Sequence, residues 1–187
     1  TARSAYTSEE GKRVMDKHAI ICSTCSVGKK CLKIRQEAHQ PLFRYDIVHY
    51  YSYLMYFPLF FSGPISTFNA WTSQIYQSQD VYSKKDVWLY FFRMVSNFLV
   101  FELFIHLIYS NAILTNPANI GIWKQFSFYE LALNSFHVLL FLWLKFTCLW
   151  RLPRAFALFD GIETTENMNR CVCNNHCFEQ FWRSWHR

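Results

Sequence analysis

The sequence predicts an all-α protein: a partial, polytopic membrane helical bundle with about three membrane segments and a re-entrant or interfacial C-terminal part. Three observations predict this class. Aromatic residues make up 20% of the 187 residues and charged residues only 17%, against about 25% charged residues in an average soluble domain. Charge is also unevenly distributed, because residues 45–150 contain five Lys/Arg and five Asp/Glu, whereas residues 1–44 contain nine and four. Finally, long stretches of the middle are almost free of charge.

The N-terminal arm, residues 1–44, is the first predicted unit. It carries a charge balance of +5 out of a net +6, and its apolar residues show no sustained period. We expect a basic polar loop with one short helix over residues 9–19. Residues 1–17 do not resemble a secretory signal, because they lack an apolar core of the needed length. Targeting is therefore expected from the membrane spans or from an upstream part of the protein.

Residues 45–187 form the second predicted unit. Its expected membrane segments are the apolar runs 45–65, 87–109 and 126–150. The last two runs each contain only two charged residues, and both are long enough to cross a bilayer core of about 30 Å. The first run is marginal, because it contains Pro58 and ends in Ser-Gly-Pro. We expect it to be kinked, tilted or re-entrant.

Buried helices of a large soluble α protein are the alternative explanation of these runs. Two features argue against it. The apolar residues occupy all faces of each run rather than one stripe, and the chain has little polar surface with which to cover three such helices. Tyr and Trp also gather at the run ends, as at Tyr50, Trp88 and Trp150, which is typical of residues at membrane–water interfaces.

Several polar groups lie within the apolar runs. Glu102 and His106 share one helix face, and Glu130 and His137 share another. These pairs predict either a polar cavity between the last two helices or, as we prefer, a hydrogen bond between helices, with Glu130 near the interface. The Gly63-Pro64 break likewise predicts either irregular backbone lining a cavity or, preferably, a helix end at the water surface.

The seven cysteines fall mainly in two groups, "CSTCSVGKKC" with Cys22, Cys25 and Cys31, and "CVCNNHC" with Cys171, Cys173 and Cys177. Combining a Cys-x-x-Cys pair with a Cys/His pair would suit tetrahedral zinc. The spacing matches no standard zinc finger, however, and the groups lie far apart in the sequence. We therefore expect reduced or lipidated thiols rather than zinc.

The last seven residues, "FWRSWHR", are dense in functional groups. His186 could act as an acid, a base or a hydrogen-bond donor, and Arg183 and Arg187 could hold a phosphate or pyrophosphate. Trp182 and Trp185 could exclude water or anchor the chain at an interface. The start of an interfacial amphipathic helix would have the same composition, so composition alone leaves both possibilities open.

Three stretches together resemble the membrane-bound O-acyltransferase family, and they are most similar to its glycerol-uptake-protein branch, a sister of hedgehog acyltransferase. The resemblance runs from about residue 45 to the last residue. Its most specific part extends from Asp160 to His186, because a long ordered string matches there. The stretches are "YFPLFFSGPISTFNAW", "LKFTCLWRLPRAFALFDGIETTENMNRCVCNN" and "FWRSWHR".

This resemblance implies a multi-pass enzyme of the endoplasmic reticulum membrane. Such enzymes move a fatty acyl group from acyl-CoA, their co-substrate, to a hydroxyl or amine. Glycosylphosphatidylinositol (GPI) anchor remodelling, by acylation of a lyso-lipid, is the leading expectation, and protein acylation of the hedgehog type is the second. A non-catalytic transport or regulatory protein is a third. The implied partners are membrane lipids, acyl-CoA and a lipid-anchor or protein acceptor, with no nucleic acid.

The resemblance also implies roles for individual residues. His186 is the expected catalytic residue of the first active-site motif. Substrate binding is expected from Asp160, Asn174, Asn175, Trp182, Arg183 and Trp185. Cys171 is a candidate haem ligand or lipidation site. The general base implied by the resemblance is a histidine in a later apolar helix, beyond residue 187. The chain is therefore expected to be a fragment, inactive by itself.

Overall fold

The computed structural model describes residues 18, 22, 25, 31–38 and 40–185. In this part of the chain the regular structure is helical, apart from one isolated antiparallel bridge between Met168 and Trp185. The all-α prediction is therefore confirmed. The short helix expected over residues 9–19 lies outside the described residues, except for His18.

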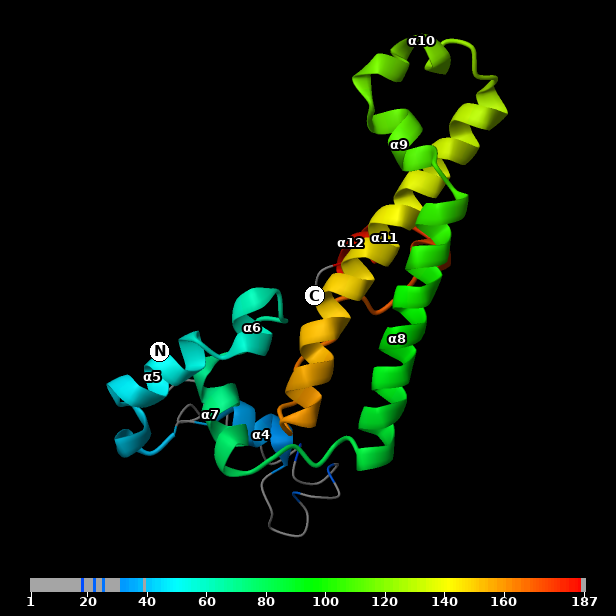
Figure 1. Cartoon of the computed structure of the whole chain (residues 1–187). Coiled ribbons are helices and arrows are strands. Elements are labelled where there is room, and N and C mark those ends of the chain that lie inside the picture. Colours follow the sequence, from blue (N-terminus) through cyan, green and yellow to red (C-terminus); the bar gives the residue numbers. More distant parts are fainter. Residues whose placement is uncertain (1–17, 19–21, 23–24, 26–30, 39, 186–187) are drawn as a thin grey trace.

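Two long helices, α8 (Lys84–Leu107) and α11 (Phe128–Phe159), run side by side (Figure 1). Each begins at a serine whose hydroxyl accepts a backbone N–H, while the carboxylate three residues later accepts in return, as a capping box requires. Their lengths correspond to about 36 and 48 Å at 1.5 Å per residue. Among the described residues, these are the two helices long and apolar enough to cross a membrane.

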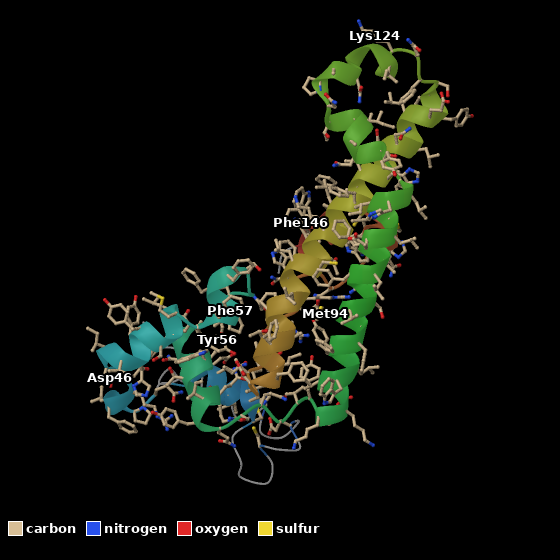
Figure 2. The ribbon with its side chains drawn as sticks, in the orientation of Figure 1. Asp46, Tyr56, Phe57, Met94, Lys124 and Phe146 are labelled. Carbon is tan, nitrogen blue, oxygen red and sulfur yellow. The ribbon has the colours of Figure 1, made fainter. Side chains whose placement is uncertain are left out.

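Apolar side chains on these two helices point largely outward. Only 6% of the most apolar window of α8 is buried, and 17% of that of α11. Leu99 and Leu103 of α8 are largely exposed, whereas Met94 is buried where α8 faces α11 (Figure 2). An outer surface of this kind suits lipid contact rather than a soluble core. The chain is therefore a partial membrane helical bundle.

The first apolar run does not form a single membrane-length helix. It divides into α5 (Ile47–Leu54) and α6 (Phe57–Phe61). Pro58 lies in the first turn of α6, where its missing N–H costs nothing. Gly63 follows α6, and a side chain there would meet the Pro58 carbonyl oxygen at 1.9 Å. The broken course expected for this run is confirmed.

A proline inside α11 explains how this broken segment docks. Pro153 has no N–H, so the carbonyl of Leu149 loses its usual donor within the helix. The hydroxyl of Ser62 donates a hydrogen bond to that carbonyl at 3.2 Å. The polar residue at the end of α6 thus occupies a position that the proline created.

The connectors also contain short helices. Helix α7 (Phe68–Tyr76) follows Gly63-Pro64, and α9 (Ser110–Thr115), η2 (Pro117–Asn119) and α10 (Ile120–Trp123) join the two long helices. Figure 1 shows the last three at one end of the α8–α11 pair and α4–α7 near the other end. The arm contributes α4 (Leu32–Glu37) and η1 (Leu42–Arg44).

The C-terminal segment returns along α11. Gly161 makes the turn with a φ of +78°, which glycine adopts without the steric cost that other residues meet. Residues 162–170 then lead to η3 (Val172–Asn174) and α12 (Phe178–Ser184). Trp71, Ala157 and Ile162 form a small buried cluster beside this turn, so α7, α11 and the returning segment share one core.

The polar groups of the long helices make local contacts. Glu130 accepts hydrogen bonds from the backbone N–H and the hydroxyl of Ser127, and the His137 ring lies 3.2 Å from the Ser110 hydroxyl. The His106 ring lies 3.6 Å from the Glu102 carboxylate, and both side chains are largely exposed. These contacts fit a helix cap, an interhelical hydrogen bond and an exposed ion pair, rather than a shared polar cavity.

Candidate functional site

The C-terminal motif is held against the middle of α11. The Trp185 ring packs edge-on against Phe146 and Trp150, with ring centroids 5.6 and 6.1 Å apart. The backbone of Trp185 also pairs with Met168. Helix α12 therefore lies beside the midpoint of α11 (Figure 1), where Figure 2 labels Phe146. His186, the expected catalytic residue, and Arg187 lie outside the described residues.

A polar cavity of about 380 Å³ opens next to this motif. It is lined by Asn169, Arg170, Gln180, Arg183 and Ser184. Two guanidinium groups in one cavity suit a phosphate or another anion, because each can donate two parallel hydrogen bonds. Gln180 Oε1 is buried and has no hydrogen-bond partner among the described residues. The cavity therefore offers two cations to a ligand.

Arg183 is free to turn toward such a ligand. Its guanidinium makes an ion pair with Glu179 at 2.7 Å, but both side chains are largely exposed. Exposed pairs of this kind contribute about 0–1 kcal/mol, so an anion could replace Glu179 at little cost. Arg170 was not among the predicted binding residues. Its place beside Arg183 depends on the path of the returning segment, which the sequence spacing does not reveal.

Three of the predicted substrate-binding residues, Trp182, Asn174 and Asn175, do not line this cavity. Trp182 is more than half exposed on α12, which suits an interfacial anchor. The Asn174 backbone N–H and the Asn175 side-chain amide both donate to the Cys171 carbonyl, at 2.9 and 3.1 Å. These bonds shape the turn before α12. Asn175 Oδ1 is buried without a hydrogen-bond partner in the described part of the chain.

Cys171 does not lie in a haem-sized pocket. It lines none of the four cavities described in this structure. None of these four cavities therefore offers Cys171 as a haem ligand, and no step of the function proposed below involves a haem. Lipidation of Cys171 stays a prediction.

Asp160 lies apart from the C-terminal motif. It follows the last residue of α11, ten residues after Trp150, which is about 15 Å along the helix axis. Tyr56 donates a hydrogen bond to Asp160 Oδ2 at 2.6 Å. Burial and the Asp160 carboxylate raise the pKa of Tyr56 above its ordinary value. The predicted site residues are therefore divided between two places.

Both Asp160 and Tyr56 border a larger, mainly apolar cavity of about 820 Å³ between α5–α7 and the end of α11. Its volume falls in the range typical of small-molecule sites. Its lining also includes Met55, Phe57 and Phe156, so it could accept an acyl chain or another lipid tail. This cavity was not predictable from the sequence, because four separate helices, α5, α6, α7 and α11, build its walls.

His49 lies at the edge of this apolar cavity and is hydrogen-bonded through both of its ring nitrogens. Its Nδ1 lies 2.5 Å from Asp46 Oδ1 and its Nε2 lies 2.6 Å from the Tyr76 hydroxyl. The pKa of Asp46 is lowered by hydrogen bonds from the His49 backbone N–H and then from the His49 ring. His49 is also a cavity-lining residue. These two hydrogen bonds link α5 to α7 and hold the imidazole in one orientation.

A buried ionic cluster supports the returning segment. Arg151 Nε and Arg154 Nη1 bind the two carboxylate oxygens of Glu166 at 3.1 and 3.2 Å. The Tyr90 hydroxyl donates to Glu166 at 2.9 Å, and Arg154 Nε donates to the Thr164 carbonyl at 2.9 Å. Both arginines closely follow the apolar run 126–150, and that position alone did not predict an ion pair. Their three-residue spacing, which places both on one face of α11, was the available signal.

The two cysteine groups do not combine. Cys22, Cys25 and Cys31 lie together with His18, whereas Cys171 and Cys173 neighbour each other elsewhere. A zinc site made from both groups, the arrangement that sequence analysis considered and did not favour, is therefore not formed among the described residues.

Comparison with known proteins gives a consistent family. The model of the membrane-bound O-acyltransferase family matches residues 4–187. Three similar relatives carry the same description. Gup1 of Schizosaccharomyces pombe is 39% identical over 144 residues, which cover 76% of this chain and 24% of the relative. In Saccharomyces cerevisiae, GUP1 is 36% identical (83% of this chain, 27% of the relative) and GUP2 is 35% identical (85% and 26%).

Two further points follow from these matches. This chain spans about a quarter of the length of the curated relatives. The family match begins at residue 4, so it includes much of the N-terminal arm, for which sequence analysis found no resemblance. The family expected from the motifs is confirmed: the chain belongs to the membrane-bound O-acyltransferase family.

Proposed function

We propose that the protein to which this chain belongs transfers a fatty acyl group from acyl-CoA to a hydroxyl of a lyso-GPI anchor lipid. We further propose that it is a multi-pass protein of the endoplasmic reticulum membrane. Family membership supports acyl transfer and a membrane location in general. The donor, the acceptor and the organelle are the proposed parts.

The position of α12 is the observation that carries the proposal. Trp185 packs on Phe146 and Trp150, near the middle of a helix long enough to cross a membrane. This packing supports a position of the motif close to the middle of the bilayer, within reach of an acyl chain. The cavity lined by Arg170 and Arg183 is built partly from the same helix. An apolar tail and an anionic head could thus both be bound close to the motif.

Acyl-CoA matches this division of charge. Its phosphate groups would bind Arg170 and Arg183, because guanidinium groups recognise phosphate oxygens in pairs. The acceptor oxygen would attack the thioester carbonyl carbon, the C–S bond would break, and CoA would leave as the thiol once a base had taken the acceptor proton. His186 would orient the acceptor or stabilise the oxyanion of the intermediate. A histidine in a later part of the protein would be the base.

The lipid acceptor also has support from the apolar cavity at the end of α11. Its volume of about 820 Å³ and its apolar lining suit lipid tails, and the Tyr56–Asp160 pair and His49 offer hydrogen bonds to a hydroxylated head group. A protein acceptor of the hedgehog type is the second candidate. A non-catalytic transport or regulatory role is the third.

Turnover by the full-length protein distinguishes these functions. We would reconstitute it in liposomes with radiolabelled acyl-CoA and supply either a lyso-GPI or a peptide with a free N-terminal amine. Label in the lipid supports the proposal. Label in the peptide alone supports protein acylation, and no label in either product supports the non-catalytic role. Residues 1–187 alone are expected to be inactive, and turnover by this segment would contradict the placement of the base.

Substitution tests the residue roles in the same assay. His186→Ala should lower kcat by roughly 100-fold or more, as expected for loss of an acid–base group. His106→Ala, a matched change on the exposed side of α8, should leave turnover intact. Arg170→Ala and Arg183→Ala should mainly raise the KM for acyl-CoA. Full activity of His186→Ala would exclude the proposed role of that residue. Imaging of the tagged protein against a reticulum marker tests the location.

A further inference from the structure

Four side chains near the start of the described chain form a group that the proposed acyl transfer does not use. They are His18, Cys22, Cys25 and Cys31, and their ligand atoms all lie within 4.8 Å of one another. His18 Nε2 lies 3.2 Å from Cys31 Sγ. Among the described residues, these four are the group of His, Cys, Asp and Glu side chains that gathers in this way.

A backbone hydrogen bond helps to bring two of these residues together. The Cys22 N–H donates to the His18 carbonyl at 2.8 Å, and residues four apart that share such a bond lie on one side of the chain. The Cys25 thiol lies with these two side chains, within the same 4.8 Å. Cys31 completes the group from the start of α4.

We propose that His18, Cys22, Cys25 and Cys31 bind one zinc ion in a closed, tetrahedral structural site. Three thiolates and one imidazole are a standard ligand set for structural zinc, and a closed set of four protein ligands leaves no position for water or substrate. With Zn–S bonds of about 2.3 Å, tetrahedral geometry places sulfur atoms about 3.8 Å apart. The observed grouping within 4.8 Å needs only a small contraction to reach it.

The surroundings suit this ion and its charge. Thiolate and imidazole ligands favour zinc over magnesium or calcium, which prefer oxygen. Three thiolates and Zn²⁺ carry a net charge of −1, and the sequence around Cys31, "GKKCLKIR", is strongly basic. All four side chains are half-buried, which leaves a path for the ion while limiting access of water and oxidants.

Helix α4 gives the site a structural purpose. Arg35 of α4 is buried and donates to the backbone carbonyls of Gln77 and Ser78, after α7. Gln36 donates to the Glu163 carboxylate at 3.2 Å, beyond the end of α11. A zinc ion on Cys31 would therefore fasten residues 18–31 to the base of the two-helix body. Zinc binding would contribute directly to the folding of this part, as in other small zinc-stabilised units.

Metal analysis of the purified protein tests the proposal. The full chain, extracted in detergent under reducing conditions, should contain one zinc per molecule by mass spectrometry of the metal. Cys25→Ser and Cys31→Ser should lose most of it. Cys173→Ser and Cys177→Ser are matched controls in the other cysteine group and should retain it. Cys25→His, which keeps a zinc ligand, should recover much of the content lost in Cys25→Ser.

A second measurement applies if the serine variants fail to fold. Cobalt exchanged into the unmodified protein should give a thiolate-to-metal charge-transfer absorption and the visible bands of tetrahedral coordination. Zinc added to the apoprotein should release protons from the thiols. Zinc far below one per chain, octahedral cobalt spectra, equal zinc content in Cys25→Ser and Cys173→Ser, or a disulfide among the three cysteines in the purified protein would each overturn the proposal.

Discussion

The two halves of helix α11 are both rich in apolar residues but have different surroundings. Residues 128–143 contain none of the helix's buried residues, whereas residues 144–159 contain all nine of them. The second half also carries Arg151 and Arg154, which are nearly inaccessible. Length and hydropathy describe α11 as one possible membrane span. The comparison shows that such a helix can have an exposed first half and a second half that packs against other segments of the chain.

Among the changes proposed here, removal of the Glu166 carboxylate, which packs against the second half of α11, should lower the stability of the protein most. Glu166→Ala leaves Arg151 and Arg154 without their counter-ion, and removing one partner of a buried pair costs about 3 to 5 kcal/mol. Thermal unfolding in detergent should show the loss in stability. Glu179→Ala removes a carboxylate from the exposed pair with Arg183 and should change stability by less than about 1 kcal/mol. Equal effects would show that the second half of α11 is not a dry, packed environment.

Truncation of leucines tests the packing directly. Leu158 is 2% exposed and Leu133 is 55% exposed. Leu158→Ala should cost about 2 to 4 kcal/mol, because it removes buried contacts and leaves a cavity. Leu133→Ala should cost much less, since detergent or lipid fills the vacated space. The two variants can be compared by their denaturation midpoints, and a larger loss for Leu133→Ala would reverse the assignment of the halves.

The turn at the end of α11 should be sensitive to any side chain. Gly161→Ala forces a φ of +78° on alanine and places its Cβ 2.9 Å from the Ser78 side chain. We expect a loss of about 1 to 2 kcal/mol from the left-handed backbone alone. Gly121→Ala meets no described atom within 4 Å of the new Cβ, and it should be neutral or slightly stabilising because alanine favours helix. Matched thermal melts measure the difference.

The Tyr56–Asp160 contact should give the smallest effect, and one that depends on pH. Because the pKa of Tyr56 is raised in the folded protein, its contribution is fully present below the unfolded pKa of about 10. The contribution is lost as pH rises toward the higher folded value. Tyr56→Phe should cost about 1 kcal/mol at neutral pH for the lost hydrogen bond.

Comparison of the unmodified protein with Tyr56→Phe at several pH values tests this dependence. The stability difference between the unmodified protein and Tyr56→Phe should shrink as pH increases above about 10. Melting temperatures of both proteins across this alkaline range measure it. A difference that stays constant or grows with pH would mean that the phenol is not held neutral by burial and by the carboxylate.

Much of the architecture was predictable from local sequence. The long helices follow from two nearly uncharged runs, and their starts follow from Ser83 and Ser127, each with a carboxylate three residues later. Pro58 and Gly63 predicted the broken first run. The family motif also predicted where a site should be sought. These properties depend on hydropathy, backbone geometry and hydrogen bonds within a few residues, which neighbours in the sequence determine.

Other features were decided only by the tertiary structure. Arg170 lines one cavity with Arg183, and Arg154 forms an ion pair with Glu166, because the chain reverses at Gly161 and runs back beside α11. Asp160 lies with Tyr56 instead of joining the other predicted site residues. The cysteines near residue 25 lie with His18 rather than with the distant cysteine group. Sequence spacing specifies which face of a helix a residue occupies, but the choice between distant partners depends on how the helices pack, and that is a property of the whole fold.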